Sequence, residues 1–565
     1  MTAVKSEESD NKSDIFTKIE RFGRYQTVQY IFVCLTLFMI SMTHVNYVFV
    51  AENVNYRCRV PECEQENQKM EIPTWWPEDI DHKCYKPILN TKKMALFNGS
   101  CSNSSFSGVI EECQHWIYEN NNSIVAELNL ACQPWKVNLV GGIHNAGMIV
   151  SMIFTGLIAD KIGRKPTFIV CAVGASIGVF KIFMTNYYWY LALEFLESVL
   201  GSGLYTVGVV LLIEVGGSSK RVLAGIIFSY AVYIGEIVFA FLAMSLQYWK
   251  WLILVVYAPM LLFILYFLCL RESTRWQMIR GRLQEAKETL KIMVRTNKID
   301  LSEKEIEDAS DDQMRLMFDV VEQKEKEDMK VIIGSKEIMT RLSVSSFCFF
   351  TSSFLYYGSL VHVVLLPGNK YTNFILSAFT AFPGEMVAYY TFNKYGRRIT
   401  LQCGYLLSAV FLIAQNYCPS SLSVEGDIIL DRKTWSRDLF YWNLHLQSGI
   451  IPYQCQRDFI RLGQHSCQDW EYVSAFNTFI GDLFFAWLRL PRGLAALYIT
   501  EIPALPSFLF SSCAVMAALL LTFTPETKNL PMFDTVAQVD SYKTSQFKEE
   551  NVETATVPNI ISTKL

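Results

Sequence analysis

Ionisable side chains interrupt several long apolar stretches of the sequence. They include one base, Lys181, and four carboxylic acids, Glu194, Glu197, Glu236 and Glu385. A charge inside an apolar helix is costly, so it normally pairs with an opposite charge, binds a charged ligand or relays protons. Glu236 and Glu385 fall in the middle of their apolar runs, and either carboxylate could hold an organic cation.

The apolar stretches that carry these residues are long enough to cross a lipid bilayer, whose core takes roughly 20 apolar residues as a helix. Hydrophobic residues make up 51% of the 565 positions and charged residues only 18%. This composition excludes an ordinary soluble globular protein. We predict ten crossings, at 27–50, 139–159, 167–185, 188–213, 223–245, 249–270, 342–366, 372–392, 399–417 and 504–524.

The turn between the second and third runs, 156–165 (GLIADKIGRK), carries charges at a helix boundary. Gly156 permits close helix approach, Asp160 can pair with a cation from a neighbouring helix, and basic residues mark the cytosolic side. A shorter copy, 396–398 (GRR), follows six crossings later, which predicts two parallel six-helix halves.

The hydrophilic loop between the first two runs holds an even cluster of cysteines together with three glycosylation sequons, at Asn98, Asn103 and Asn121. Such a loop is expected outside the cell, with up to three disulfides whose pairing is left open. The cysteines are Cys58, Cys63, Cys84, Cys101, Cys113 and Cys132.

These features give a domain order for an all-α polytopic membrane protein. Two six-helix halves make nominally 12 transmembrane helices, two more than the ten apolar runs of the sequence. Both termini are expected in the cytosol, and the plasma membrane is the expected location. The expected units are a tail (1–26), an N-terminal transmembrane half (27–270) with the extracellular loop 51–138, a cytosolic helical loop (271–340), a C-terminal half (341–535) and a disordered tail (536–565).

Several short motifs make the chain resemble the major facilitator superfamily, and within it the organic cation, organic anion and carnitine transporters. Sugar transporters share versions of the motifs at 156–165, 272–276 and 525–528, but they lack the long cysteine-rich loop. The remaining motifs are 22–26 (FGRYQ), 116–118 (WIY), 123–132 (SIVAELNLAC), 214–221 (EVGGSSKR) and 356–358 (YYG).

The resemblance implies the major facilitator fold and transport by alternating access, with charged residues of the cytosolic edge biasing the two states. Some of these residues would otherwise only anchor helices at the membrane interface. The gating and motif candidates are Gly156, Asp160, Gly163, Arg164, Lys165, Glu214, Arg221, Glu272, Arg275, Gly396, Arg397, Arg398 and Glu526.

The resemblance also places aromatic side chains at the substrate cavity, where a ring attracts an alkylammonium group by roughly 0.5–2 kcal/mol. The alternative for each ring is packing or interface anchoring. One departure concerns selectivity: the cation carriers have a carboxylate where this chain has Ala381, and Glu385 lies about one helical turn away. The cavity candidates are Tyr205, Tyr230, Tyr233, Glu236, Tyr356, Tyr357 and Glu385.

The segment 420–491 departs from the resemblance because it is too polar for two membrane helices. Our hypothesis is a reading-frame error or a non-standard splice. In a shifted frame, residues 433–441, 450–458 and 465–470 read as patterns typical of helices ten and eleven of the family. As printed, the segment also favours an inactive or non-transporting isoform.

The expected function is therefore a secondary transporter of a small organic ion, with a sugar-type facilitator or a non-transporting isoform as alternatives. The partners are the organic ion, the lipid bilayer and a coupling ion, H⁺ or Na⁺, but no nucleic acid. No enzyme activity, cofactor or metal is expected, and no nucleotide-binding loop is present in the sequence. His44, His144 and His362 occur singly, so packing is the expected role of each.

Overall fold

The computed structural model describes most of the chain outside the tails and the polar segment. Residues 1–21 and 525–565, nearly all of 420–491, Asn98 and Asn103 lie outside the described residues, and so does Glu526. The side chains of Arg221, Tyr356, Tyr357, His362 and Arg397 are also outside the description. The described residues are 22–52, 54–64, 70–77, 79–89, 101, 106–217, 220–299, 301–308, 336–365, 369–417, 421–424, 428–431 and 505–524.

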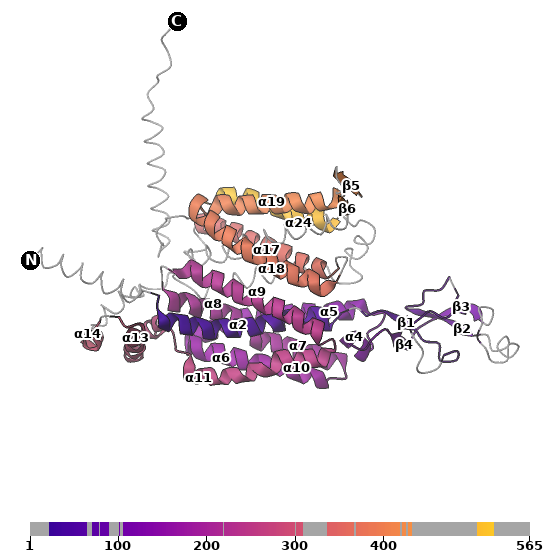
Figure 1. Cartoon of the computed structure of the whole chain (residues 1–565), viewed down its shortest axis with the longest axis horizontal. Helices are drawn as coiled ribbons and strands as arrows, with labels where there is room; N and C mark the ends of the chain where they lie inside the picture. The colour runs from indigo at the N-terminus through magenta and orange to yellow at the C-terminus, as the bar shows by residue number, and fades with distance from the viewer. Residues whose placement is uncertain are drawn as a thin grey trace, which may run out of the picture.

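The N-terminal half is a bundle of long apolar helices (Figure 1). Six segments of the described chain are long and apolar enough to cross a membrane, and they coincide with the first six predicted runs. The elements are α2 (Arg24–Val50), α5 (Pro134–Ile162), α6 (Arg164–Ala175), η2 (Ser176–Phe183), α7 (Tyr187–Gly201), α8 (Gly203–Gly216), α9 (Arg221–Ser245), α10 (Trp249–Tyr257), η4 (Ala258–Leu265) and α11 (Tyr266–Cys269).

Small residues let the helices of this bundle approach closely, as is usual where membrane helices pack. A Cβ atom on Gly147 of α5 would lie only 2.7 Å from the Cβ atom of Ser198 on α7. The outer surface keeps large apolar side chains such as Phe180, Phe183 and Leu268 exposed. Such a surface suits contact with lipid rather than water.

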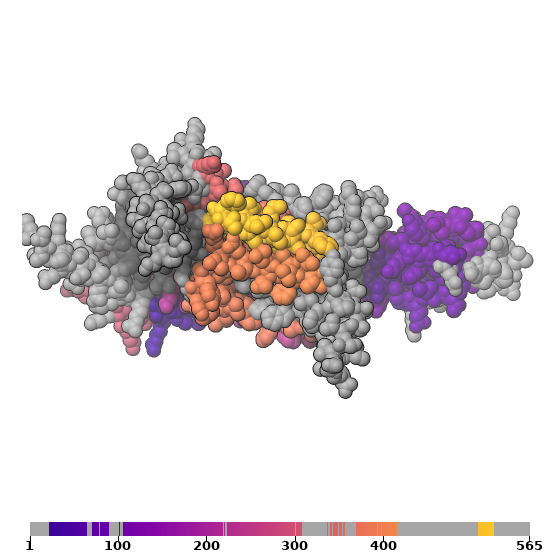
Figure 2. Space-filling model, turned by 90° about the horizontal axis from the view of Figure 1, so that it is seen from above, coloured from indigo at the N-terminus to yellow at the C-terminus, as the bar shows by residue number. Residues whose placement is uncertain are grey.

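The C-terminal helices form a second layer beside the first (Figure 1). In this layer α18 packs against α9 of the N-terminal bundle, and α19 packs against α24. Figure 2 shows α24 lying along the neighbouring C-terminal helices. The elements are α17 (Lys336–Leu365), α18 (Lys370–Tyr395), α19 (Arg397–Tyr417), α24 (Leu505–Leu520) and η5 (Leu521–Phe523).

The cysteine-rich loop projects from one end of the bundle as a small β-structured unit (Figure 1). Two antiparallel pairs, β1 (Tyr56–Cys58) with β4 (Trp116–Tyr118) and β2 (Tyr85–Leu89) with β3 (Phe106–Glu112), form its frame. Arg57 and Glu64 make a buried ion pair at 2.6 Å.

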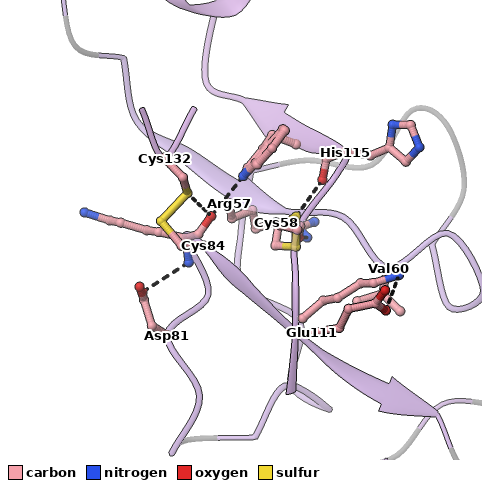
Figure 3. Close-up of a disulfide and its surroundings, with 12 residues drawn as sticks. Arg57, Cys58, Val60, Asp81, Cys84, Glu111, His115 and Cys132 are labelled. Atoms are coloured by element: carbon pink, nitrogen blue, oxygen red, sulfur yellow. Dashed lines mark hydrogen bonds and ion pairs between the residues drawn. A yellow bond between two sulfur atoms is a disulfide. The ribbon is translucent and has the colours of Figure 1, made fainter. Parts of the chain in front are cut away.

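All six predicted cysteines of this loop form disulfides, in the pairs Cys58–Cys113, Cys63–Cys101 and Cys84–Cys132. Figure 3 shows the Cys84–Cys132 bond close to Cys58. The first and third bonds therefore fasten the two ends of the loop to its interior.

The loop returns to the membrane through the short helix α4 (Ile124–Glu127), which Ser123 caps. The Ser123 hydroxyl accepts a hydrogen bond from the backbone N–H of Val125 at 3.2 Å. The same oxygen lies 3.0 Å from the carbonyl oxygen of Val50 and 2.8 Å from that of Glu52. One buried side chain thus joins the start of α4 to the end of α2.

The segment after the sixth run forms short helices at the end of the bundle opposite the loop (Figure 1). They are α12 (Thr274–Ile279), α13 (Leu283–Asn297) and α14 (Glu303–Asp308), which lie within the segment 271–340. The Asn297 side chain accepts a 2.8 Å hydrogen bond from the backbone N–H of Tyr25, so α13 is tied to the start of α2.

The polar segment contributes one described feature, the antiparallel pair β5 (Ser421–Val424) and β6 (Ile428–Asp431). No membrane helix occurs among the few residues of 420–491 that the structure describes.

Candidate functional site

The predicted cytosolic turn is organised around one carboxylate, Glu272. Its Oε1 accepts hydrogen bonds from the backbone N–H groups of Arg164 at 3.0 Å and Lys165 at 3.2 Å, and its Oε2 accepts from Lys165 at 3.1 Å. These amides are the unpaired donors at the start of α6, where a negative charge is also favoured by the helix dipole. Burial nevertheless raises the pKa of the Glu272 carboxyl above its usual value.

Gly163 is required at this turn for two reasons. Its φ of +128° is in the region that side chains disfavour, and a Cβ atom there would lie 2.4 Å from Glu272 Oε2. Gly396, at the start of α19 in the second copy of the motif, has a similar φ of +92°. The two copies therefore share a backbone conformation, which agrees with the predicted internal repeat.

The other charged residues of the turn form consecutive ion pairs that link α5, α6 and α8. Arg164 pairs with Asp160, and its Nη2 lies 3.5 Å from Glu214 Oε1. The Asp160 carbonyl oxygen accepts from Trp276 Nε1 at 2.8 Å and from Arg280 Nη2 at 2.7 Å. The turn thus lies at the same end of the bundle as α12 and α13, opposite the cysteine-rich loop.

The remaining described motif residues do not belong to this ion-pair network. Gly156 is buried on α5, and Lys165 Nζ donates to the Phe267 carbonyl oxygen at 2.8 Å. Among the described residues Arg275 makes no ion pair, and Arg398 is half-buried at the start of α19.

A second group of predicted residues meets where α9 and α18 join the two halves. The Tyr233 hydroxyl lies 3.3 Å from Glu385 Oε1, and the Tyr230 hydroxyl donates to the Phe382 carbonyl oxygen at 3.3 Å. The Phe382 ring centroid lies 4.9 Å from that of Tyr230 and 5.8 Å from that of Tyr233. A buried carboxylate beside three aromatic rings is suited to holding an organic cation.

Tyr205 and Glu236 continue this group into the N-terminal half. The Tyr205 ring contacts Phe228 of α9 at 6.2 Å between centroids, and it contacts His44 of α2 at 5.9 Å. The Glu236 carboxylate is buried and interacts electrostatically with the phenols of Tyr205 and Tyr233.

The other three intramembrane ionisable residues form a separate cluster. Lys181 Nζ lies 2.9 Å from Glu194 Oε2 and 3.5 Å from Glu197 Oε2, and all three side chains are at most 1% exposed. The Lys181 ammonium also donates to the Tyr257 hydroxyl at 3.0 Å.

Histidines complete this cluster, which corrects the expectation that His44 and His144 pack singly. His144 Nδ1 lies 2.9 Å from Glu194 Oε1, and His144 Nε2 lies 3.2 Å from His44 Nδ1. The sequence predicts the acids and the lysine of this cluster but not the histidines, because the two rings are 100 residues apart in the chain. Their appearance in the first two apolar runs was the available signal.

The two halves also meet at the end nearest the cysteine-rich loop, at residues that sequence reasoning missed. Lys370, at the start of α18, pairs with Glu52 after α2. The Phe49 ring stacks on Tyr371 at 5.5 Å and contacts Phe374 edge-on at 5.3 Å. These contacts close the described halves against each other on this side.

Asn121, the third predicted glycosylation residue, is exposed beside α4.

Known proteins resemble the chain over most of its length. The family model described as sugar (and other) transporter matches residues 96–426. The organic cation transporter protein of Drosophila melanogaster is 25% identical over 561 residues, covering 96% of each chain. Solute carrier family 22 member 2 of Homo sapiens is 25% identical over 478 residues, covering 83% of this chain and 79% of that protein.

Solved structures resemble the chain in fold. The partially occluded, inward-open xylose transporter XylE from E. coli has a TM-score of 0.56 at 12% identity, covering 90% of this chain and 99% of that one. XylE described as a major facilitator superfamily proton:xylose symporter, bound to a bromodeoxyglucose, has a TM-score of 0.54 at 14% identity, covering 92% and 98%. At these identities the likeness shows the major facilitator fold.

Proposed function

Because this chain belongs to the sugar (and other) transporter family, we propose that it is a secondary transporter whose substrate is a small organic ion with a cationic group. Alternating access moves the substrate, and the proposal includes no catalytic step. An organic cation and a carnitine-like zwitterion both carry such a group. An organic anion is the remaining member of the predicted substrate class.

The observation that carries this proposal is the group formed by Glu385, Tyr233, Tyr230 and Phe382 between α9 and α18. A carboxylate hydrogen-bonded to a phenol and flanked by aromatic rings matches an alkylammonium group in charge and surface. The group joins the two halves that must move relative to each other. The relatives that span most of the chain include a protein named for organic cation transport, which favours the same substrate class.

Uptake by the purified full-length chain in proteoliposomes tests the proposal. We expect labelled tetraethylammonium or carnitine to enter, and labelled glucose to be excluded. Glu385→Gln should lower uptake of the cationic probe roughly 10-fold or more, since a hydrogen bond to a charged group contributes about 1.5–3 kcal/mol. Glu288→Gln, an exposed acid on α13, is the matched control. Glucose uptake without cation uptake would contradict the proposal.

The gating role of the cytosolic turn belongs to the same proposal. The chain Asp160–Arg164–Glu214 and the capping carboxylate of Glu272 join α5, α6, α8 and the segment before α12. Breaking these contacts would loosen the predicted cytosolic end of the N-terminal half and so shift the balance between the two states. At the opposite end, the Lys370–Glu52 pair joins the two halves directly.

We further propose a plasma-membrane location with both termini in the cytosol and sugar on the cysteine-rich loop. The loop and the turn 156–165 lie at opposite ends of the bundle, as this topology requires (Figure 1). The coupling ion would be H⁺ or Na⁺. Epitope tags at both termini, and the glycosidase-sensitive mass of wild type against Asn121→Gln, test the topology.

A non-transporting isoform is the second candidate, favoured by the polar segment 420–491. The family match ends at residue 426, inside this segment. Sequencing of the transcript decides whether the printed frame is real. If it is, surface expression without uptake of any probe would support this candidate against transport.

A further inference from the structure

We propose that the buried cluster of His144, Glu194, Glu197 and Lys181 is a proton-binding site, and that its proton is co-transported with the organic ion. The inference rests on the proposed transport function. It assigns the cluster a ligand, H⁺, that is distinct from the organic substrate held between α9 and α18.

Charge balance is the first argument. Two carboxylates surround one ammonium group, at 2.9 Å and 3.5 Å, in a place where all three side chains are at most 1% exposed. With both histidines neutral, the cluster carries one excess negative charge. An uncompensated buried charge is costly, so one additional proton makes the cluster neutral and stabilises it.

The position of His144 is the second argument. Its Nδ1 lies 2.9 Å from Glu194 Oε1 and 3.8 Å from Glu197 Oε2, so the ring faces both acids. Its Nε2 faces His44 Nδ1 at 3.2 Å. A neutral His144 donates from Nδ1 to Glu194 and accepts at Nε2 from His44.

A proton can therefore be added without loss of a hydrogen bond. When H⁺ binds at His44 Nε2, the Nδ1 proton of His44 passes to His144 Nε2, which becomes the donor. His44 then accepts at Nδ1 and carries the new proton on Nε2. The only covalent change at His144 is one new N–H bond. Both protonation states are fully hydrogen-bonded across this pair, as expected of a reversible proton site.

A metal ion is a poorer occupant of the same place. His144, Glu194 and Glu197 offer ligand atoms within 4.8 Å of one another. However, the Lys181 ammonium already lies between the two carboxylates and would repel a cation. Tyr257 also fixes the position of the ammonium group, since its ring centroid lies 4.4 Å from Lys181 Nζ.

The cluster is connected to the proposed substrate site through His44. The His44 ring contacts Tyr205 edge-on, and Tyr205 contacts Phe228 on α9, the helix that carries Tyr230 and Tyr233. Two successive ring contacts, His44 with Tyr205 and Tyr205 with Phe228, therefore connect His44 to α9. The titratable groups that face the cluster are His44 and Tyr47 on α2, His144 on α5, Lys181 on η2, Tyr190, Glu194 and Glu197 on α7, Tyr205 on α8, Glu236 on α9 and Tyr257 on α10.

Proton binding is tested first without any substrate. Proton uptake by the full-length chain in nanodiscs is measured between pH 8 and pH 5.5 for wild type and Glu197→Gln, which makes the cluster neutral without a proton. We expect the variant to take up roughly one proton fewer per chain. The control Glu288→Gln changes an exposed acid on α13, far in sequence from the buried cluster, and should differ from wild type by less than about 0.1 proton. A Glu197→Gln difference as small as that of the control would overturn the site.

His144→Gln is the second variant, because it removes the proton-accepting ring while leaving both acids and Lys181 in place. It should show the same deficit of roughly one proton as Glu197→Gln. Full proton uptake by a folded His144→Gln chain would overturn the assignment to this ring.

Coupling is tested with labelled carnitine and tetraethylammonium in proteoliposomes at clamped membrane potential. A one-unit pH gradient, alkaline inside, should drive accumulation of the transported probe up to about tenfold in wild type, since one pH unit is a factor of ten. Glu197→Gln should equilibrate the probe without accumulation. Equal accumulation of the probe by wild type with and without the pH gradient would overturn the coupling. If neither probe enters at all, the proposed transport function is wrong, and the proton-binding site is then judged by the proton uptake in nanodiscs alone.

Discussion

Replacing Lys181 by methionine removes the ammonium group from the buried cluster while keeping an unbranched side chain of similar length. The variant leaves Glu194 and Glu197 facing each other without the cation that separates them. It also removes the donor to the Tyr257 hydroxyl. The expected result is a large loss of stability with the helical bundle otherwise unchanged.

The magnitude follows from burial and distance. Lys181 contacts Glu194 at 2.9 Å and Glu197 at 3.5 Å, and its side chain is 0% exposed. Removing one partner of such a buried ion pair costs about 3–5 kcal/mol, because the remaining charge has no compensation. An exposed ion pair would cost only about 0.2–1 kcal/mol.

The free energy of unfolding, measured by denaturant titration of the full-length chain in mixed micelles, checks this estimate. Lys304→Met, an exposed lysine on α14, is the matched control and should change the free energy by less than about 0.5 kcal/mol. The double variant Lys181→Met with Glu197→Gln should recover part of the loss, since only one carboxylate then remains. If Lys181→Met lowers the free energy of unfolding by less than about 1 kcal/mol, the reasoning is refuted, because a loss that small is typical of solvent-exposed ion pairs.

Three further predictions concern the two ends of the bundle. Gly163→Ala should lower the thermal unfolding midpoint more than Gly281→Ala does, because both positions have positive φ but only Gly163 would place a Cβ atom against Glu272, at 2.4 Å. Burial raises the pKa of Glu272, so folding favours its protonated form. The stability that this protonated form contributes is therefore lost as the pH rises from 4.5 through the raised pKa, and Glu272→Gln should remove this part of the pH dependence of unfolding. Lys370→Glu should be destabilising, and adding Glu52→Lys should restore a coupling energy of about 0.2–1 kcal/mol in a double-mutant cycle, as for other partly exposed pairs.

Three outcomes would contradict these predictions. Equal midpoints for the two glycine variants would mean that strain alone, and not the contact with Glu272, matters at the turn. If the unfolding stabilities of wild type and Glu272→Gln change with pH in parallel, Glu272 is not the group whose titration affects stability. A coupling energy of zero would mean that the Lys370–Glu52 contact does not hold the two halves together.

Apolar length alone was enough to predict the first six helices, because a bilayer demands roughly 20 apolar residues regardless of what the helix packs against. The same criterion joined α7 and α8 into one run, and the structure agrees except for a turn at Ser202. The charged turn 156–165 could also be predicted from the sequence, because its glycine and its acid lie at a helix boundary. Its main capping group, Glu272, was identified as a motif residue, but its partners are backbone amides, which no sequence pattern displays.

The side-chain pairs between helices were not readable in the same way. Which face of α2 meets α5 depends on packing of the whole bundle, so the contact of His44 with His144 could not be inferred. The strands of the outer loop are three to seven residues long and lack a regular alternation, so disulfides rather than periodicity fix them. The substrate group was predicted only in part, because the Phe382 ring was not among the cavity candidates.

The engagement of Ser123 sets an order of events during biosynthesis. The hydroxyl of a sequon must be reachable by the glycosylating enzyme, yet in the folded chain it is buried and occupied by Val125 and by the carbonyls of Val50 and Glu52. A sugar on Asn121 must therefore be attached while the nascent chain is still extended, before α4 docks against the first helix. A chain whose loop closes too early would lack the proposed sugar at this asparagine.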